Sequence, residues 1–142
     1  RGESYRVSRC IAYLTQKKSG LTEEERLLFD GRVYGCDTCQ QVCPYNQQAN
    51  PDPILGPSIG LLDAEEVLFM SNRIFRATFG DHAFAWVGAT TIKRNLLIAA
   101  AVKKDPRLEG WIARLESVAP PALEDTLDWA KAFVSKMSKN HF

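Results

Sequence analysis

The sequence predicts a mainly α-helical fold, in which a cysteine-bearing region precedes an array of short helices. All four cysteines lie in residues 1–46, and three of the seven prolines lie in residues 47–60. From residue 61 onward, apolar residues recur at helical spacing, and no strand-like alternation is present. We therefore divide the chain into a cysteine region (1–46), a linker (47–60) and a helical region (61–142).

The cysteine region contains signals for two short helices. Residues 8–14 predict a helix that carries Cys10. Thr22, followed three positions later by Glu25, forms a capping box for a helix through Leu28 and Phe29. Asp30-Gly31 is expected to end that second helix.

The helical region contains several predicted helix starts, marked by residues that cap a first turn or by prolines that suit it. These signals lie at Asp63, at Asn72, at Thr90 or Thr91, at Asp105-Pro106 and at Pro120-Pro121. Apolar residues at spacings of four and three mark the last helix, from Leu123 to Met137. Short helices joined by short loops favour stacked antiparallel pairs, as in an α-solenoid, and the alternative is an irregular helical bundle.

Composition and charge exclude some classes of protein. The apolar and charged fractions, 45% and 25%, are those of a soluble globular protein, and charges interrupt every long apolar stretch. The N-terminus has no apolar core of a secretory signal, so we expect a cytoplasmic protein without disulfides. It also lacks an initiator Met, which favours a fragment.

The net charge is only +1, but basic residues gather in one stretch. Residues 71–107 hold seven Lys or Arg against two acids, whereas residues 59–70 hold three acids and no base. Such a stretch suits contact with a polyanion, and the alternative is a solvated helix surface.

The cysteine spacing predicts iron–sulfur ligation. Cys36 and Cys39 are three positions apart, and Cys43 follows four positions later, directly before Pro44. This ending resembles the bacterial ferredoxin run, in which the cysteine before proline binds the other of two clusters. By that logic Cys10, Cys36 and Cys39 share one 4Fe-4S cluster, and Cys43 binds a second.

Other arrangements of the same cysteines stay open. They are a zinc site, disulfides, and closure of all four cysteines around one ion or cluster. A cubane cluster takes four thiolates, so two clusters need more cysteines than the four present here. We therefore expect a Cys-x2-Cys-x2-Cys-x3-Cys-Pro run upstream of Arg1, with this chain as the second half of a two-cluster module.

Residues 9–15 and 31–46 together resemble epoxyqueuosine reductase. The pattern Tyr-Gly-Cys-Asp-x-Cys-Gln-x-Val-Cys-Pro-x-Asn at residues 34–46 is far more specific than cysteine spacing. A weaker likeness continues through residues 93–95 and 129–130.

The resemblance implies an oxidoreductase that uses cobalamin and two 4Fe-4S clusters to reduce epoxyqueuosine to queuosine in the anticodon loop of tRNA. It implies an N-terminal domain that carries cobalamin, then a ferredoxin-like module, then HEAT-like repeats that help to hold the tRNA. This chain would be the end of that module and the repeats, inactive alone. The parent enzyme would be a monomer that receives electrons from an external donor.

The resemblance also implies roles for individual residues. Asp37 and Thr38 match positions near the corrin, so they are candidate cobalamin contacts, and the alternative is a structural role in the cluster loop. The candidate tRNA contacts are Lys17, Lys18, Lys93, Arg94 and Asn95. Phe84 and Trp86 are aromatic residues that suit base stacking, but we expect both to lie in the core.

The chain departs from the family pattern at Ala101-Val102 and at Asp125-Thr126, which bears on the tRNA contacts of the repeats. Two rival functions stay open. One is a non-catalytic helical adaptor in which all four cysteines form a structural zinc or cluster site. The other is a ferredoxin-type electron carrier for a different redox enzyme.

Overall fold

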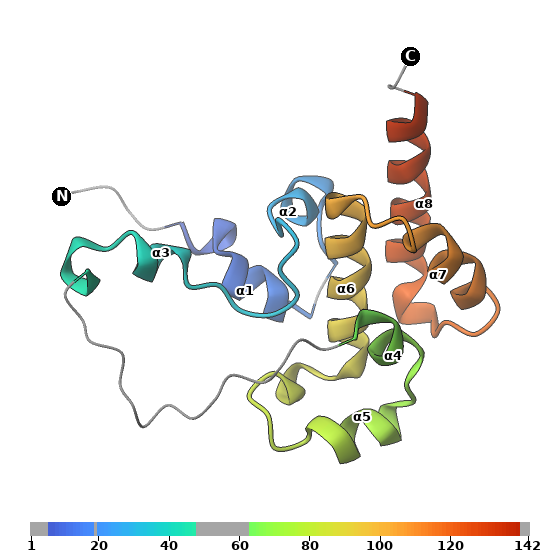
Figure 1. Cartoon of the computed structure of the whole chain (residues 1–142), viewed down its shortest axis with the longest axis horizontal. Helices are drawn as coiled ribbons and strands as arrows, with labels where there is room; N and C mark the ends of the chain where they lie inside the picture. Colours follow the sequence, from blue (N-terminus) through green and yellow to red (C-terminus); the bar gives the residue numbers. More distant parts are fainter. Residues whose placement is uncertain (1–5, 19, 48–62, 140–142) are drawn as a thin grey trace.

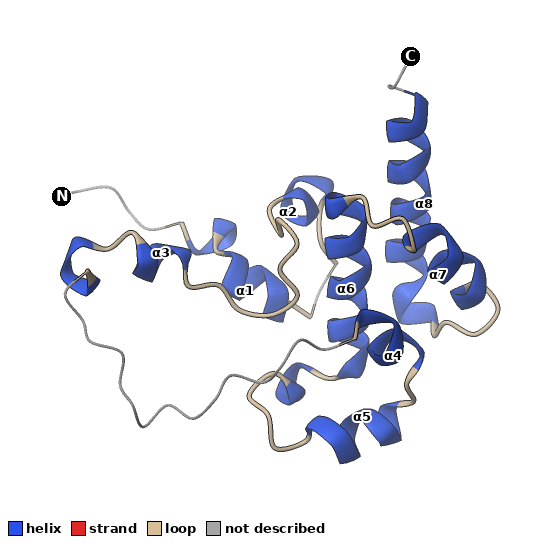
Figure 2. Cartoon of the chain, in the orientation of Figure 1, coloured by secondary structure: helices blue, strands red, loops and turns tan. Residues whose placement is uncertain are grey.

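The computed structural model describes residues 6–18, 20–47 and 63–139, and this part of the chain is helical without strands (Figure 2). Nearly all of the predicted linker lies outside the described residues. The cysteine region contains η1 (Val7–Arg9), α1 (Ile11–Gln16), α2 (Glu23–Leu27), α3 (Thr38–Gln41) and η2 (Pro44–Asn46). The helical region contains α4 (Ala64–Phe69), α5 (Asn72–Phe79), η3 (Ala85–Val87), α6 (Ala89–Lys103), α7 (Leu108–Leu115), η4 (Pro121–Leu123) and α8 (Glu124–Lys139).

Some predicted helix starts are confirmed. Thr22 and Glu25 form the complete capping box at α2, with both reciprocal hydrogen bonds present. The Asp63 carboxylate accepts the backbone N–H of Glu65 at 2.8 Å and so caps α4. Pro121 begins η4, which runs directly into α8.

Other predicted starts are wrong by one or two residues. Ser71, not Asn72, caps α5, because its hydroxyl accepts the N–H of Ile74 at 3.2 Å. α6 begins at Ala89, before both predicted threonines, and follows Gly88 at φ +87°. The helix predicted over residues 8–14 is interrupted at Cys10, which is extended and is the N-cap of α1.

Helix α6 is the centre of the structure (Figure 1). It contacts α1, α2, α4, α5, α7 and α8. Its sequence is rich in Ala, Leu and Ile on all sides, which is typical of a helix that is buried all round. A residue in the left-handed conformation, Lys104 at φ +56°, ends it.

The core consists of three apolar clusters, and α6 contributes to each of them. One packs Leu97 and Ala101 against α4, α7, η4 and α8, and another packs Ile92 against α4, α5 and η3. In the third, Ile98 meets Leu14, Leu21 and Phe29 of the cysteine region. The two regions predicted from sequence therefore share apolar packing through α6.

The departures from the family pattern fall at structural positions. Ala101 and Thr126 are 1% and 2% exposed. Val102 packs at the edge of the third cluster. Asp125 pairs with the buried guanidinium of Arg26. These positions thus support the core and an ion pair with α2.

Candidate metal centre

Three of the four cysteines line one cavity. It has a volume of about 320 Å³ and is bounded by Arg6, Arg9, Cys10, Ile11, Cys36, Thr38 and Cys39. Cys43 is not among the lining residues. Cys10, Cys36 and Cys39 therefore share the lining of this cavity, and their division between clusters stays a prediction.

Each cysteine lies in a short helix or within two residues of the start of one. Cys10 precedes α1, and its carbonyl accepts the N–H of Leu14 at 2.9 Å. Cys36 follows Gly35, which has φ +68°, a conformation that disfavours residues with a Cβ. Cys39 lies within α3, and Cys43 directly precedes the proline that opens η2.

Side chains of α3 lie against two of the sulfur atoms. The Thr38 hydroxyl is 3.3 Å from Cys36 Sγ, and Gln40 Nε2 is 3.9 Å from Cys39 Sγ. Arg32 Nη2 donates to the Thr38 hydroxyl at 3.0 Å. Polar contacts of this kind adjust the reduction potential of a cluster when its thiolates are bound to iron.

Asp37 is exposed and makes hydrogen bonds within its own loop. Its carboxylate accepts Gln41 Nε2 at 2.8 Å, and its carbonyl accepts the N–H groups of Gln40 and Gln41. The carboxylate does not cap α3. Both Asp37 and Thr38 remain on the surface, where a ligand can reach them.

The residues around the cavity fit an iron–sulfur cluster. Three thiol side chains line the cavity, and thiolates are the protein ligands of such clusters. A cluster is larger than a single metal ion, and its thiolates stand apart around it. Arg6 and Arg9 at the cavity suit the negative charge of such a group.

The two candidate tRNA contacts that follow α1, Lys17 and Lys18, differ in whether a carboxylate already pairs with them. Lys17 Nζ donates to both carboxylate oxygens of Glu25, at 2.8 and 2.9 Å, and this contact lowers the pKa of Glu25. Lys18 is exposed, and its ammonium lies 5.6 Å from the centre of the Trp86 ring. Among the residues that the structure describes, Lys18 has no carboxylate partner, unlike Lys17.

Of the candidate residues on α6, Lys93 is half-buried, and Arg94 and Asn95 are buried. Lys93 Nζ donates to the carbonyl of Met70, and burial lowers the pKa of Lys93. Arg94 and Asn95 are 9% and 0% exposed. Burial, followed by the nearby charge of Arg26, lowers the pKa of Arg94. This placement favours a structural role for Arg94 and Asn95 over the predicted phosphate contact.

Trp86 is the residue whose predicted burial is wrong. Its side chain is 60% exposed, whereas Phe84 packs against Phe75 and Phe79 as predicted. Trp86 Nε1 donates to the Tyr34 hydroxyl at 3.1 Å, and that hydroxyl donates to the Ala83 carbonyl at 3.1 Å. The first of these contacts joins residues 52 positions apart, so no local signal indicates it.

Trp86 is one of the residues that line a polar hollow of about 350 Å³. The hollow lies at the N-terminal end of α6 and includes Lys18, Asn72 and Arg76. An aromatic face beside two cations is therefore open to solvent on this side.

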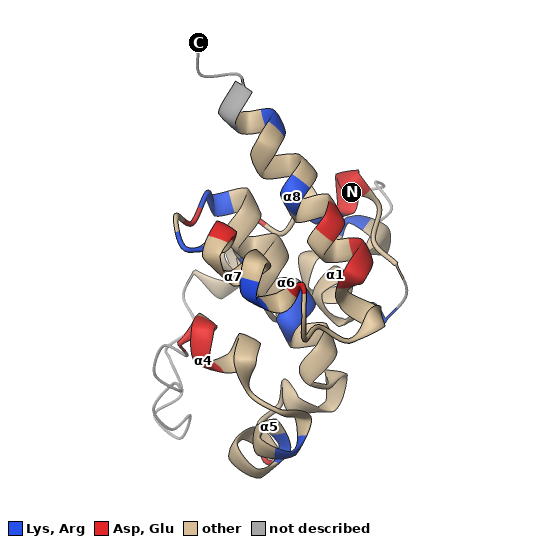
Figure 3. Cartoon of the chain, turned by 90° about the vertical axis from the view of Figure 1, so that its right-hand side faces the viewer, with Lys and Arg blue, Asp and Glu red and all other residues tan. Residues whose placement is uncertain are grey.

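Ion pairs reduce the basic character of residues 71–107. Lys103 pairs with Asp30 at 2.7 Å, and Arg107 pairs with Asp105 at 2.8 Å. Across residues 6–18, 20–47 and 63–139, no ion pair involves Arg73, Arg76 or Lys104. The ribbon in Figure 3 is coloured for Lys and Arg on several helices, and for Asp and Glu on α4 and elsewhere.

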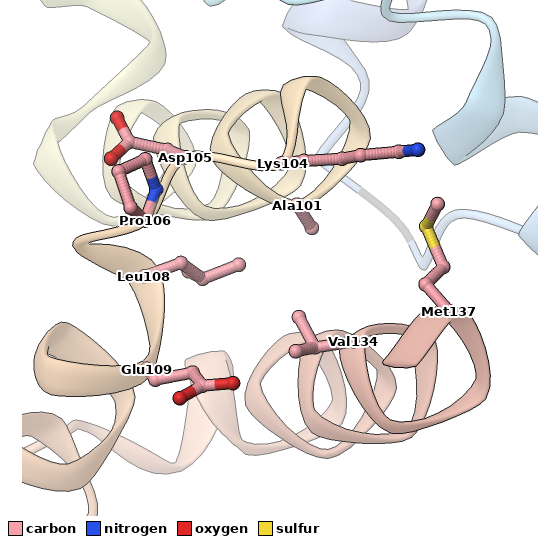
Figure 4. A pocket seen from close by; sticks show the side chains of 8 residues that line it. All are labelled: Ala101, Lys104, Asp105, Pro106, Leu108, Glu109, Val134 and Met137. Atoms are coloured by element: carbon pink, nitrogen blue, oxygen red, sulfur yellow. The ribbon is translucent and has the colours of Figure 1, made fainter. Parts of the chain in front are cut away.

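A further cavity, of about 490 Å³, lies between the end of α6, α7 and α8 (Figure 4). Its lining is mainly apolar and includes Ala101, Leu108, Val134 and Met137. It includes none of the cysteines, so it belongs to the packing of the helical region and not to the metal centre. No helix in the described ranges is long and apolar enough to cross a membrane.

Comparison with known proteins gives consistent matches. Residues 2–46 match the family described as a 4Fe-4S double cluster binding domain. The epoxyqueuosine reductase of Listeria monocytogenes is 38% identical over 131 residues, which are 85% of this chain and 33% of that protein. That of Bacillus subtilis is 37% identical over 129 residues, 87% of this chain and 33% of that protein.

Solved structures give the same result. A structure of the Bacillus subtilis epoxyqueuosine reductase has a TM-score of 0.77 at 36% identity, covering 87% of this chain and 35% of that one. An epoxyqueuosine reductase with a tRNA-Tyr epoxyqueuosine-modified stem loop has a TM-score of 0.79 at 34% identity, covering 90% of this chain and 36% of that one. The resemblance found in the sequence is confirmed, and the chain spans about one third of these relatives.

Proposed function

We propose that this chain is the C-terminal part of an epoxyqueuosine reductase, because it matches about one third of the length of such enzymes. Its role in that enzyme is to supply cluster ligands and a surface for tRNA. The grouping of Cys10, Cys36 and Cys39 around one cavity, with Cys43 outside it, carries the proposal. The activity, reduction of epoxyqueuosine to queuosine in tRNA, belongs to the whole enzyme, and this chain alone is expected to be inactive.

The cysteines would hold two different 4Fe-4S clusters. Cys10, Cys36 and Cys39 supply three ligands of one cluster, and Cys43 supplies one ligand of the other. The remaining thiolates would come from outside residues 1–142. When bound, the clusters pass single electrons from an external donor toward the cobalamin of the whole enzyme.

Iron content and spectra test this division of ligands. The full-length protein is reconstituted without oxygen, and Cys39→Ser and Cys43→Ser are compared with Cys36→Ser. Each change is expected to remove about half of the bound iron, because each removes a ligand of one of two clusters.

The spectra then distinguish which cluster remains. Cys36→Ser and Cys39→Ser should leave the same residual electron paramagnetic resonance signal, and Cys43→Ser a different one. Identical residual signals from all three variants would contradict the division. A colourless protein with one zinc would instead establish the structural four-cysteine site of a non-catalytic adaptor.

Asp37 and Thr38 are the proposed contacts to cobalamin. Both are exposed at the start of α3, beside Cys36, so they can face a corrin held by another part of the enzyme. Their side chains are engaged with Gln41 and Arg32, which fixes the directions in which their oxygens point. Asp37→Asn is expected to weaken cobalamin binding without loss of iron, and unchanged corrin affinity would rule out this contact.

The tRNA surface is proposed at the N-terminal end of α6, around Lys18, Arg76 and Trp86. The cationic groups of Lys18 and Arg76 suit phosphates, and the exposed indole of Trp86 suits stacking on an unpaired base. The anticodon loop offers both features. Lys17, Lys93, Arg94 and Asn95 remain predicted contacts, but their engaged side chains supply less direct support.

Binding of an anticodon stem loop tests this surface. Trp86→Ala is expected to weaken binding about tenfold, as loss of one stacked base does. Lys18→Gln should lower the salt dependence of the affinity by about one unit in log–log slope. Lys104→Gln, at the opposite end of α6, is the matched control and should change neither value. Equal effects from Lys18 and Lys104 would indicate only nonspecific attraction.

The proposal also covers the architecture of the helical region and the state of the whole enzyme. We infer that the helical region is a HEAT-like array, because α6 and α8 run in similar directions with α7 beside them (Figure 1). A monomeric, cytoplasmic parent enzyme fits a substrate that is tRNA. The ferredoxin-type carrier remains the second candidate, and the absence of any preference for RNA would favour it.

A further inference from the structure

We propose that Arg94 and Asn95 are positioning residues that hold the two cysteine-bearing segments together around the first cluster. This inference rests on the cluster ligation proposed above and goes beyond it, because neither residue is a ligand. The two side chains reach from the centre of α6 to the segment after Cys10 and to the loop before Cys36. We call this set of hydrogen bonds the α6 clamp.

The Asn95 amide is the centre of the α6 clamp. Asn95 Nδ2 donates to the Thr15 carbonyl at 2.7 Å and to the Val33 carbonyl at 2.8 Å. Its Oδ1 accepts Arg94 Nε at 3.1 Å and Nη2 at 2.9 Å. Two donors and two acceptor positions are thus all used, as a fully buried amide requires.

Arg94 extends the α6 clamp to the end of α1. Its Nη1 donates to the Lys17 carbonyl at 2.7 Å, and Lys17 is the C-cap of that helix. A cation at the C-terminus of a helix lies where the backbone dipole favours it. In the part of the chain that the structure describes, the Arg94 guanidinium makes no ion pair, so its bonds go to this carbonyl and to Asn95.

Thr15 links the α6 clamp directly to the residue before a cluster ligand. The buried Thr15 hydroxyl accepts the N–H of Gly35 at 3.1 Å and donates to the Ala12 carbonyl at 3.1 Å. Gly35 directly precedes Cys36, and α1 connects Thr15 rigidly to its N-cap, Cys10. The separation of Cys10 and Cys36 is therefore set through Thr15, which Asn95 holds in place.

This arrangement explains why buried polar residues occupy the middle of an otherwise apolar helix. The end of α1 and the loop before Cys36 present the backbone carbonyls of Thr15, Lys17 and Val33 toward α6, beside the apolar contacts of Leu14. A buried amide and guanidinium satisfy those carbonyls in one geometry, whereas apolar side chains would leave them without partners. The α6 clamp thus fixes the positions of the ligands before iron binds.

The test compares three variants of the full-length protein after reconstitution without oxygen. Asn95→Leu removes the centre of the α6 clamp, and Thr15→Val removes its bond to Gly35 with little change in shape. Lys93→Met is the matched control, because it removes a bond from the same helix to the Met70 carbonyl, away from the cysteines. Thermal unfolding, release of iron to a chelator and the midpoint potential of each cluster are measured.

We expect Asn95→Leu to release iron from the first cluster about tenfold faster, since a buried carbonyl pair loses its donor. Thr15→Val should act in the same direction and more weakly, so it retains the test if Asn95→Leu folds poorly. Both should shift the potential of the cluster that Cys36→Ser abolishes and leave that of the other unchanged. Lys93→Met should lower the unfolding temperature and change neither the release of iron nor the potential of either cluster.

Two results would overturn the inference. One is an unchanged potential and iron release in both Asn95→Leu and Thr15→Val, and the other is an equal change in Lys93→Met. Either result leaves the proposed function standing if the unsubstituted protein binds its clusters. If the unsubstituted protein binds no iron, the proposed function and the α6 clamp both fail.

Discussion

The segment around the cysteines and the body around α6 are stabilised in different ways. Helix α3 buries none of its residues, and the nearby Val42 and Tyr45 are 68% and 88% exposed. Helix α6, in contrast, has nine buried residues and contributes to all three apolar clusters. The body around α6 is therefore held by an apolar core, whereas α3 and the residues after it are held mainly by hydrogen bonds.

If the cysteines hold clusters as proposed, the difference predicts where ligation would contribute to stability. A segment with little buried apolar surface gains its order from ligation, since binding to the folded form alone stabilises that form. A segment with a closed core does not need the ligand. The two parts should consequently respond to different perturbations.

The largest loss of global stability is expected from Leu97→Ala. Leu97 is fully buried in the cluster formed with α7 and α8. Its truncation should lower the free energy of unfolding by about 2–5 kcal/mol, measured by urea denaturation. Val118→Ala, at a side chain 68% exposed, is the control and should change it by less than about 0.5 kcal/mol. A loss of structure confined to the cysteine segment would contradict the view that the core around α6 sets the global stability.

Removal of the clusters by a chelator is expected to destabilise the cysteine segment and to leave the core around α6 nearly unchanged. Backbone amides of α3 should exchange with solvent about tenfold faster or more, because ligation no longer opposes local opening. Amides in the middle of α6 should exchange at nearly the same rate as before. Hydrogen exchange followed by mass spectrometry measures both. A uniform increase over the chain would mean that the two parts unfold together.

Gly35→Ala should affect the cysteine segment by a smaller amount. Gly35 has φ +68°, and the space for an added Cβ is open, so the cost is backbone strain and not a clash. We expect about 1 kcal/mol of lost stability together with weaker iron retention.

Gly20→Ala is the matched control for Gly35→Ala. Its added Cβ also meets no atom within 4 Å, and its φ lies outside the positive range. Retention of iron in the Gly35 variant equal to that of the Gly20 variant would show that the left-handed turn is dispensable.

The smallest effect is expected from Glu25→Gln. Lys17 and the capping contact at Thr22 lower the pKa of Glu25 below its ordinary value of 4.5. The charged form of Glu25 therefore stabilises the fold at pH values above its ordinary pKa. That stabilisation is lost as the pH falls through the lowered pKa of the folded state. Glu25→Gln should cost about 0.5 kcal/mol at pH 7 and almost nothing at strongly acidic pH.

Urea denaturation at both pH values measures the effect of Glu25→Gln. Glu24→Gln is the control, since its partner Arg9 is 3.6 Å away and both side chains are mostly exposed. A loss at acidic pH as large as that at neutral pH would point to the cap and not to the charge pair.

Local signals in the sequence were sufficient for the helical class and for several helix ends. The capping box at Thr22 and the cap at Asp63 depend on residues two or three positions apart, so the pattern indicates them directly. The proximity of Cys36 and Cys39 is equally local, because they are three positions apart, whereas Cys10 comes to the same cavity from 26 positions before Cys36. Cap choices one residue apart, such as Ser71 against Asn72, were not separable, since both side chains suit the position.

The sequence by itself thus determined that the chain is helical, that its cysteines suit iron–sulfur clusters, and which enzymes it resembles. Only the tertiary structure decided which polar residues face solvent. Helix α6 is apolar all round, so its periodicity gives no inner and outer face for Lys93, Arg94 and Asn95. The burial of Asn95 and the exposure of Trp86 follow from partners 52 to 80 positions away, and no pattern in the nearby sequence encodes those contacts.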